Sequence, residues 1–192
     1  MQGSSIDNAP PQWKTILIRG LPMLFIPVIL LVIILLMNSF YFLEYFHVIV
    51  GSTWTGMDLV MGVFFSYIMA GLNPMQRTVV ATRLTPTMLF FMPAIATSTI
   101  TAGIYLAIAD HISFYNPYFI AVAVIVLILL VQGLGIFLPN EARVYMEIIH
   151  GAKNVEKIVR LTMLNLKLSV VQLILQIILI FFMATFAVGG VA

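Results

Sequence analysis

The chain has 192 residues, of which 62% are hydrophobic and 8% are charged, with a formal net charge of +2. A soluble domain of this size cannot cover its surface with so few charges, so the composition predicts an integral membrane protein. The absence of cysteine excludes disulfides, Fe–S clusters and thiolate metal sites. A metal or haem would depend on histidine, methionine, carboxylate or backbone ligands.

Five apolar runs are long enough to cross a bilayer, which predicts an all-α antiparallel helical bundle with five transmembrane helices. The first run lacks a convincing cleavage site and is interpreted as a retained helix. It follows a cytoplasmic segment over residues 1–20, occupies residues 21–43, and is treated as an addition to a four-helix module over residues 44–192. The predicted runs are about 21–42, 46–71, 87–109, 118–138 and 164–188.

The connections between these runs are predicted from turn and charge signals. Glu44 and Tyr45 mark a tight turn, and residues 72–86 are predicted to form a polar loop. Pro139 ends the fourth run, and Asn140 is a candidate N-cap for a charged amphipathic helix at about 140–163. That cytoplasmic helix either lies along the membrane surface or forms a helical hairpin that breaks at Gly151.

The basic residues fix the expected orientation. Two lie before the first span, two in the second-to-third connection and five in the charged helix and its exit, which accounts for all 9 lysines and arginines. The opposite connections carry Glu44, Asp110 and His111 and no basic residue. The positive-inside rule therefore predicts an inner (plasma) membrane protein with a cytoplasmic N-terminus and an external C-terminus.

One stretch of the second run, residues 47–56, gathers the residues of greatest interest. Helical spacing places His47, Gly51, Trp54 and Asp58 on one face. Ionisable side chains in lipid are costly and usually face a bundle interior. Asp58 is predicted to be a neutral acid bonded to the 97–101 threonine cluster or to Gln172 and Gln176, or else to act in a proton or ion relay. In the purely structural interpretation, Trp54 fills space and Gly51 and Gly56 are packing notches.

Two histidines are candidate ligands at the predicted outer face. His47 and His111 could ligate haem b or copper, with Glu44 and Asp110 at the same level as partners for a ring N–H. The alternative is that His111 is an ordinary solvated loop residue. His150 lies at the cytoplasmic level and cannot join this site.

Two methionines offer a second metal hypothesis. Met57 and Met61 are four residues apart on the second run, and thioethers suit Cu(I). Methionine is also an ordinary gap filler in apolar cores. No nucleophile–base pair, phosphate loop or zinc motif is evident, so catalytic activity by this chain alone is not expected.

Several motifs together resemble a known family. They are His47-x3-Gly51-x2-Trp54-x-Gly56, Asn73-Pro74 with Arg77 and Arg83, Thr101-Ala102-Gly103, the charged helix, and Phe182-Met183-Ala184-Thr185. Over about residues 44–187 they resemble the four-helix membrane module of CopD-like copper-resistance proteins and the N-terminal membrane domain of PuuD-type proteins. The resemblance implies a functional histidine at the position of His47, and copper uptake or redox chemistry beside cytochromes.

The leading functional expectation is a small non-catalytic membrane subunit of a respiratory or redox complex, holding haem b or a metal through His47. Its partners would be the lipid bilayer and other membrane subunits, and not nucleic acid. The alternative is a copper-handling transport protein. A third interpretation is a proton- or ion-coupled transporter built around Asp58.

Overall fold

The computed structural model describes the backbone of residues 13–188 and the side chains of residues 20–188. The described residues form helices joined by short turns and contain no strand, which confirms the predicted all-α membrane bundle. Of the predicted N-terminal segment, residues 1–20, residues 1–12 lie outside the described residues, and residues 13–20 belong to the helix α1 rather than to a segment before it. In chain order the elements are α1 (Trp13–Met37), α2 (Phe40–Leu59), the π-helix η1 (Val60–Phe65), α3 (Ser66–Ala70), α4 (Pro74–Ala109), α5 (Pro117–Gln132), the π-helix η2 (Gly133–Phe137), α6 (Leu138–Ile149) and α7 (Val155–Ala187).

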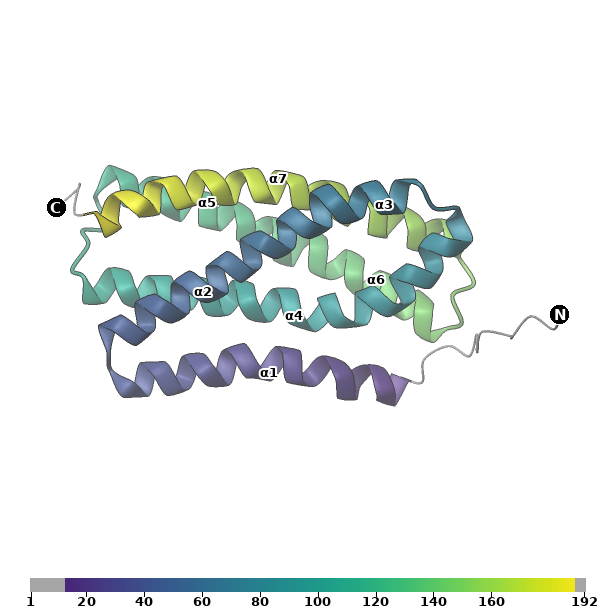
Figure 1. The fold of residues 1–192 in the computed structure, drawn as a ribbon, viewed down its shortest axis with the longest axis horizontal. Helices are drawn as coiled ribbons and strands as arrows, with labels where there is room; N and C mark the ends of the chain where they lie inside the picture. Colours follow the sequence, from purple (N-terminus) through teal and green to yellow (C-terminus); the bar gives the residue numbers. More distant parts are fainter. Residues whose placement is uncertain (1–12, 189–192) are drawn as a thin grey trace.

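Five continuous helical rods within the described residues are long and apolar enough to span a membrane. Two of them are composite, because α2, η1 and α3 follow one another without interruption, as do α5, η2 and α6. The start of α1, the α3–α4 turn and the α6–α7 turn lie at one end of the bundle (Figure 1). We call this the basic end, because the lysines and arginines lie in these segments or in the adjoining parts of α4, α6 and α7. The α1–α2 turn and the α4–α5 loop lie at the other end, called the acidic end.

The first turn differs from the predicted one. α1 ends at Met37, and the chain reverses at Asn38, with a positive φ of 47°, and Ser39. Asparagine tolerates this left-handed conformation, whereas Glu44 and Tyr45 continue the helix that begins at Phe40. The predicted turn at Glu44–Tyr45 and the boundary between residues 43 and 44 are therefore wrong.

The predicted polar loop over residues 72–86 is mostly helical. Asn73 caps α4: its side chain accepts from the backbone of Gln76, and the Gln76 side chain accepts from the backbone of Asn73. Pro74 occupies the first turn, where a missing N–H costs nothing. The loop prediction is wrong because this capping box outweighs the polar composition of the residues after it.

The predicted break at Pro139 is also absent. The helix continues from α5 through η2 into α6, and the wider π turn directly before Pro139 accommodates its missing N–H. Asn140 is not an N-cap; it is buried, and its Nδ2 donates to Asn165 Oδ1 at 2.9 Å. The charged segment adopts the hairpin arrangement, turning at Gly151 with φ of 92°.

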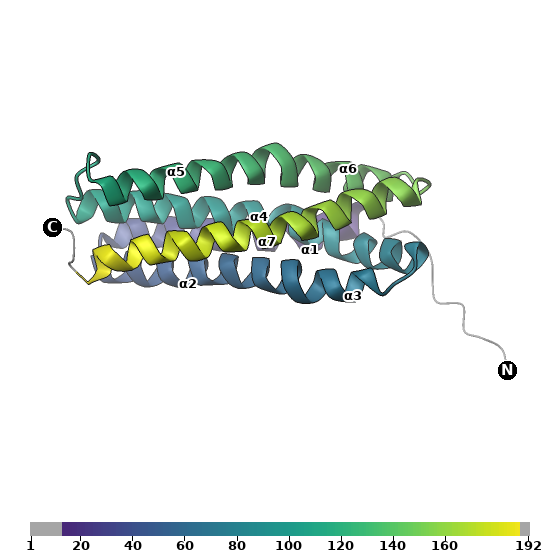
Figure 2. The same cartoon turned by 90° about the horizontal axis from the view of Figure 1, so that it is seen from above.

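The bundle is packed in three apolar clusters. One at the acidic end joins α1, α2 and α4 through Leu31, Phe46 and Ala102. A second, in the middle, surrounds Trp54, and a third, at the basic end, joins α4, α6 and α7. Figure 2 shows the α5–α6 rod bending outwards between its ends, whereas α4 and α7 run through the bundle.

The first helix is part of this packing rather than a separate anchor. α1 lies along α4 (Figure 1), and Gly20 is so close to Phe90 that a Cβ at Gly20 would lie 2.3 Å from the ring. Large apolar side chains such as Leu127, Val131 and Ile177 cover the outer surface of the rods. A continuous apolar surface of this kind is expected to face lipid.

Candidate functional site

His47 lies in the second turn of α2 and packs against α4. Its Nδ1–H donates to the backbone carbonyl of Thr99 at 2.9 Å. The ring lies over Gly103, where a Cβ would come within 2.9 Å of its Cε1 atom. The bond at Nδ1 fixes the tautomer and leaves Nε2 as the nitrogen that can accept a ligand.

The second candidate histidine is not brought to His47. His111 is an exposed residue with φ of 53° in the turn after α4. It follows Gly103 by eight residues, which corresponds to about 12 Å along a helix axis. No three His, Cys, Asp or Glu side chains in the described part of the chain are close enough together to hold a metal ion.

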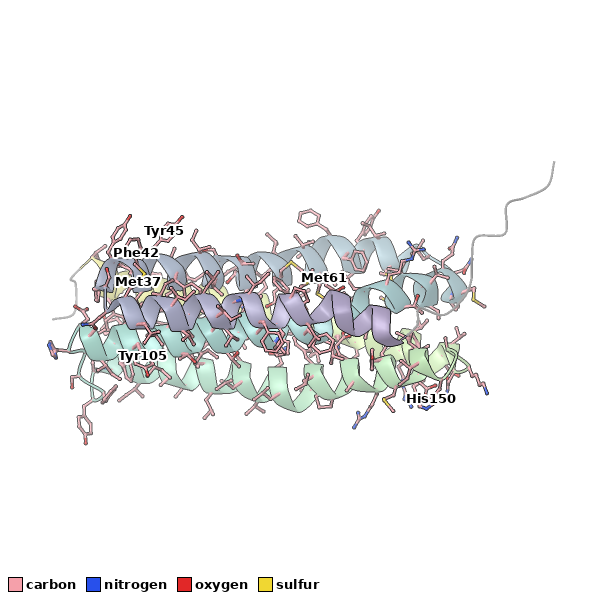
Figure 3. The ribbon with its side chains drawn as sticks, turned by 90° about the horizontal axis from the view of Figure 1, so that it is seen from below. Met37, Phe42, Tyr45, Met61, Tyr105 and His150 are labelled. Atoms are coloured by element: carbon pink, nitrogen blue, oxygen red, sulfur yellow. The ribbon has the colours of Figure 1, made fainter. Side chains whose placement is uncertain are left out.

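The methionines are also distant from His47. Met57 and Met61 are half-buried, and Met57 is ten residues beyond His47 on the same rod, about 15 Å along its axis. Figure 3 shows Met61 between the two ends, with Tyr45 at the acidic end and His150 at the basic end. His47 is therefore not joined by a second candidate ligand within the described residues, and His150 is separate from it, as predicted.

The two predicted packing glycines differ. A Cβ at Gly51 would lie 3.3 Å from Thr99 Cγ2, so this glycine lets α2 approach α4. A Cβ at Gly56 would meet no atom within 4 Å, so the packing role predicted for Gly56 is not found. The closest approach to the backbone of another helix is at Gly62 in η1, where a Cβ would lie 2.8 Å from the backbone nitrogen of Val170.

Asp58 is fully buried, with an exposed fraction of 0%, next to Trp54 on the inward face of α2. Gln176 Nε2 donates to Asp58 Oδ2 at 3.0 Å, which confirms one of the predicted partners. Ser169 is a second polar neighbour of the carboxyl group. Asp58 Oδ1 has no hydrogen-bond partner, and neither has Gln176 Oε1.

Asp58 faces a row of polar side chains along α7. They are spaced three or four residues apart and so share one helical face, and all of them are buried. We call them the α7 polar row: Thr162, Asn165, Ser169, Gln172 and Gln176. Gln132 of α5 also meets α7, through a 2.9 Å bond from Nε2 to the backbone carbonyl of Leu168. Polar groups of this density in a bundle core indicate more than packing.

A second acidic side chain meets the same row nearer the basic end. Glu141 Oε1 accepts from Asn165 Nδ2 at 2.9 Å, while Glu141 Oε2 is buried without a partner. Thr85 of α4 is a further neighbour of this carboxyl group. The only ion pair among the described residues joins Lys157 and Glu147 at 2.7 Å, so neither Asp58 nor Glu141 is neutralised by a basic side chain.

A partly open cavity lies between the rods. Its walls come from α4, the α5–α6 rod and α7, with Trp54 and Met61 contributed by the α2–α3 rod. Most of its lining is apolar. Its polar lining includes Glu141 and four members of the α7 polar row, all but Gln176. Both π-helices contribute residues to its walls, and π-helical turns are frequent at functional sites.

Sequence reasoning missed Glu141 and the basic-end half of this network. Pro139 and Asn140 resemble a helix start, and local rules therefore place Glu141 on a surface helix. The spacing of Thr162, Asn165 and Ser169 continues the face that carries Gln172 and Gln176, and this periodicity is the signal that could have found them. The structure joins Asp58 to that row and keeps it apart from His47.

Comparisons with protein-family models, with curated proteins and with solved structures gave no match, so neither the family nor the predicted resemblance is established by them.

Proposed function

We propose that this protein is a non-catalytic membrane component that binds and releases a single positive charge, a proton or a small monovalent cation, at Asp58. The observation that carries the proposal is the full burial of Asp58 with one carboxyl oxygen unpartnered and no basic side chain among the described residues paired to it. An unpaired carboxylate in such surroundings is too costly to persist, so it must take up a proton or a cation.

The surroundings of Asp58 fit such a ligand. Gln176 donates to one carboxyl oxygen of Asp58. The other carboxyl oxygen, Asp58 Oδ1, and the amide oxygen, Gln176 Oε1, remain as acceptors without partners on the two bonded side chains. Oxygen atoms of this kind suit either the proton of a carboxylic acid or a hard cation. Ser169 lies beside Asp58 and also lines the cavity, which provides a route for exchange.

The membrane orientation expected from the basic residues indicates the side from which a proton or cation would reach Asp58. With the basic end in the cytoplasm, the N-terminus is cytoplasmic, the C-terminus is external, and the members of the α7 polar row that line the cavity lie on the cytoplasmic side of Gln176, the partner of Asp58. Exchange would then occur from the cytoplasmic half of an inner (plasma) membrane.

Infrared difference spectroscopy of the purified protein in lipid tests this function. We expect a protonated-carboxyl band that disappears in Asp58→Asn and persists in Asp110→Asn, whose substituted residue is exposed at the acidic end. If the band also disappears on adding sodium salt but not choline salt, the bound charge is a metal cation competing with the proton. A spectrum without any carboxyl band sensitive to Asp58→Asn, together with no sodium binding, would refute the proposal.

A second candidate function is supported by the geometry of His47. Its Nδ1–H is bonded to Thr99, as the second nitrogen of a metal-ligating histidine usually is, and Nε2 makes no hydrogen bond in the described structure. The chain would supply one axial ligand to haem b, or one ligand to copper, and a neighbouring subunit of a respiratory or redox complex would supply the others.

The spectrum and metal content of the protein isolated with its membrane partners test this second function. A Soret band lost in His47→Ala and kept in His150→Ala supports haem, and copper that follows the same pattern supports the copper-handling alternative. If the protein purifies alone in mild detergent with neither haem nor copper, both the haem-binding and the copper-handling proposals fail.

A further inference from the structure

The end of the cavity at Glu141 has a chemistry distinct from that at Asp58. Glu141 and Asp58 meet the α7 polar row at Asn165 and Gln176, which are eleven residues apart, or about 16 Å along the helix axis. The two acidic groups therefore belong to separate sites, and ligand binding at Glu141 does not depend on charge exchange at Asp58.

Three residues that line the cavity each carry a buried oxygen without a hydrogen-bond partner. These oxygens are Glu141 Oε2, Thr162 Oγ1 and Gln172 Oε1. Thr162 and Gln172 are 3% and 2% exposed. Leaving buried polar atoms unpaired costs about 1–3 kcal/mol each, so a ligand that supplies donors is strongly favoured. The carboxylate oxygen of Glu141 and the amide oxygen of Gln172 can only accept, which indicates a ligand with a donating, positively charged head group.

The remaining walls are apolar and specify the other part of the ligand. Met88 and Met92 of α4 and Leu134 and Phe137 of η2 face the same space. Methionine side chains adapt their shape to varied apolar partners. Because the cavity lies within the membrane-spanning segments and is partly open, an apolar molecule can reach it from lipid.

We propose that this cavity binds a hydrophobic organic cation, namely a long-chain primary amine or a molecule of equivalent chemistry, with its ammonium group at Glu141 and its apolar body between α4 and η2. The ammonium group donates to Glu141 Oε2 and to Thr162. The charge of the head group compensates an acidic side chain that no basic residue in the described part of the chain pairs with.

Fluorescence quenching of Trp54 measures this binding directly. The chain contains 2 tryptophans, and Trp13→Phe leaves Trp54, which lines the cavity, as the only reporter. The probe is 11-bromoundecylamine, and the matched controls are 11-bromoundecanol and 11-bromoundecanoic acid, which share its chain and bromine. We expect the amine to quench at a concentration roughly tenfold or more below the alcohol, the ratio that one hydrogen bond to a charged group gives.

Two variants, each with a control, test where the ammonium group and the apolar chain of the amine bind. Glu141→Gln should abolish the preference for the amine over the alcohol, whereas Glu156→Gln, at an exposed site, should not. Gly133→Leu should weaken binding of the amine, because Gly133 lines the cavity and has open space around it. Gly135→Leu is its control, since Gly135 has equally open space in the same π-helix but does not line the cavity.

The outcomes separate this site from Asp58. Asp58→Asn should leave amine binding unchanged, even if it removes the carboxyl band. Equal quenching by all three probes would mean simple partitioning into the lipid or detergent and would overturn the proposal. An amine preference that survives Glu141→Gln, or binding that Gly133→Leu and Gly135→Leu affect equally, would overturn it as well.

Discussion

His47 and Asp58 lie on the same rod, yet the bundle buries them in different ways. The Nδ1 nitrogen of His47 donates to the backbone carbonyl of Thr99, and the ring rests on Gly103. Asp58 is held by a neutral amide, and one of its oxygens remains without a partner. At His47 the helices thus share one hydrogen bond, whereas Asp58 and the α7 polar row keep buried acceptors without partners next to a cavity. An unsatisfied buried group, rather than an ionisable group as such, points to a binding site.

The largest effect is expected where the rods approach most closely in the basic-end half. Gly62→Ala places a Cβ 2.8 Å from the backbone of Val170, and backbone cannot move aside as a side chain can. We expect a loss of about 1–3 kcal/mol in the free energy of unfolding, measured by reversible denaturation in mixed detergent micelles.

Gly56→Ala is the matched control, because a Cβ there meets nothing within 4 Å. It should leave stability unchanged or raise it by up to about 1 kcal/mol through helix propensity. Equal losses in the two variants would show that η1 and α7 are not in contact at Gly62.

The bond between Asp58 and Gln176 should show strong coupling. Asp58→Leu leaves the Gln176 amide buried without a partner, and we expect a cost of about 1–3 kcal/mol in the free energy of unfolding. Adding Gln176→Leu removes the stranded group, so the double variant should be more stable than the sum of the two single changes predicts. Strict additivity in this double-mutant cycle would contradict the observed contact.

The contact of His47 predicts a smaller effect in the acidic-end half. Gly103→Ala pushes the ring, whose Cε1 would lie 2.9 Å from the new Cβ, and breaks its bond to Thr99. We expect a loss of about 0.5–1.5 kcal/mol, the net value of one hydrogen bond. In a His47→Ala background the same change should cost less, because no ring remains to be displaced. If Gly103→Ala costs as much stability in the His47→Ala background, the loss does not come from contact with the His47 ring.

Some structural features of this molecule could be predicted from the sequence and others could not, and the difference has physical reasons. Five apolar runs and the one-sided basic residues predict the number of spans and the shared end of three connections, because bilayer thickness and charge placement are properties of the chain itself. The partner of Asp58 was also predictable, since Gln172 and Gln176 share a buried face.

Two of the misplaced boundaries share one cause. Local rules interpret proline, asparagine and polar residues at 72–86 and at 139–140 as breaks, but a capping box and a π-helix allow the helices to continue. The same rules place Glu141 on a surface helix, although the extended α5–α6 rod brings it inside. The packing of five rods decides which residues with unpaired oxygens line the same cavity. No local pattern in the chain contains that information.

The smallest effect is expected at the ion pair that closes the basic end. Lys157 Nζ and Glu147 Oε1 are 2.7 Å apart, but their side chains remain 35% and 23% exposed, so water screens the attraction. Glu147→Gln should therefore lower the free energy of unfolding by only about 0.2–1 kcal/mol, and the loss should shrink as salt is added. Glu156→Gln, on the same hairpin without an ion pair, should show neither the loss nor its dependence on salt. A large, salt-independent loss in Glu147→Gln would mean that a buried charge holds the hairpin. The solvated ion pair of the basic end would then no longer contrast with the carboxyl groups of Asp58 and Glu141, which lie inside the bundle.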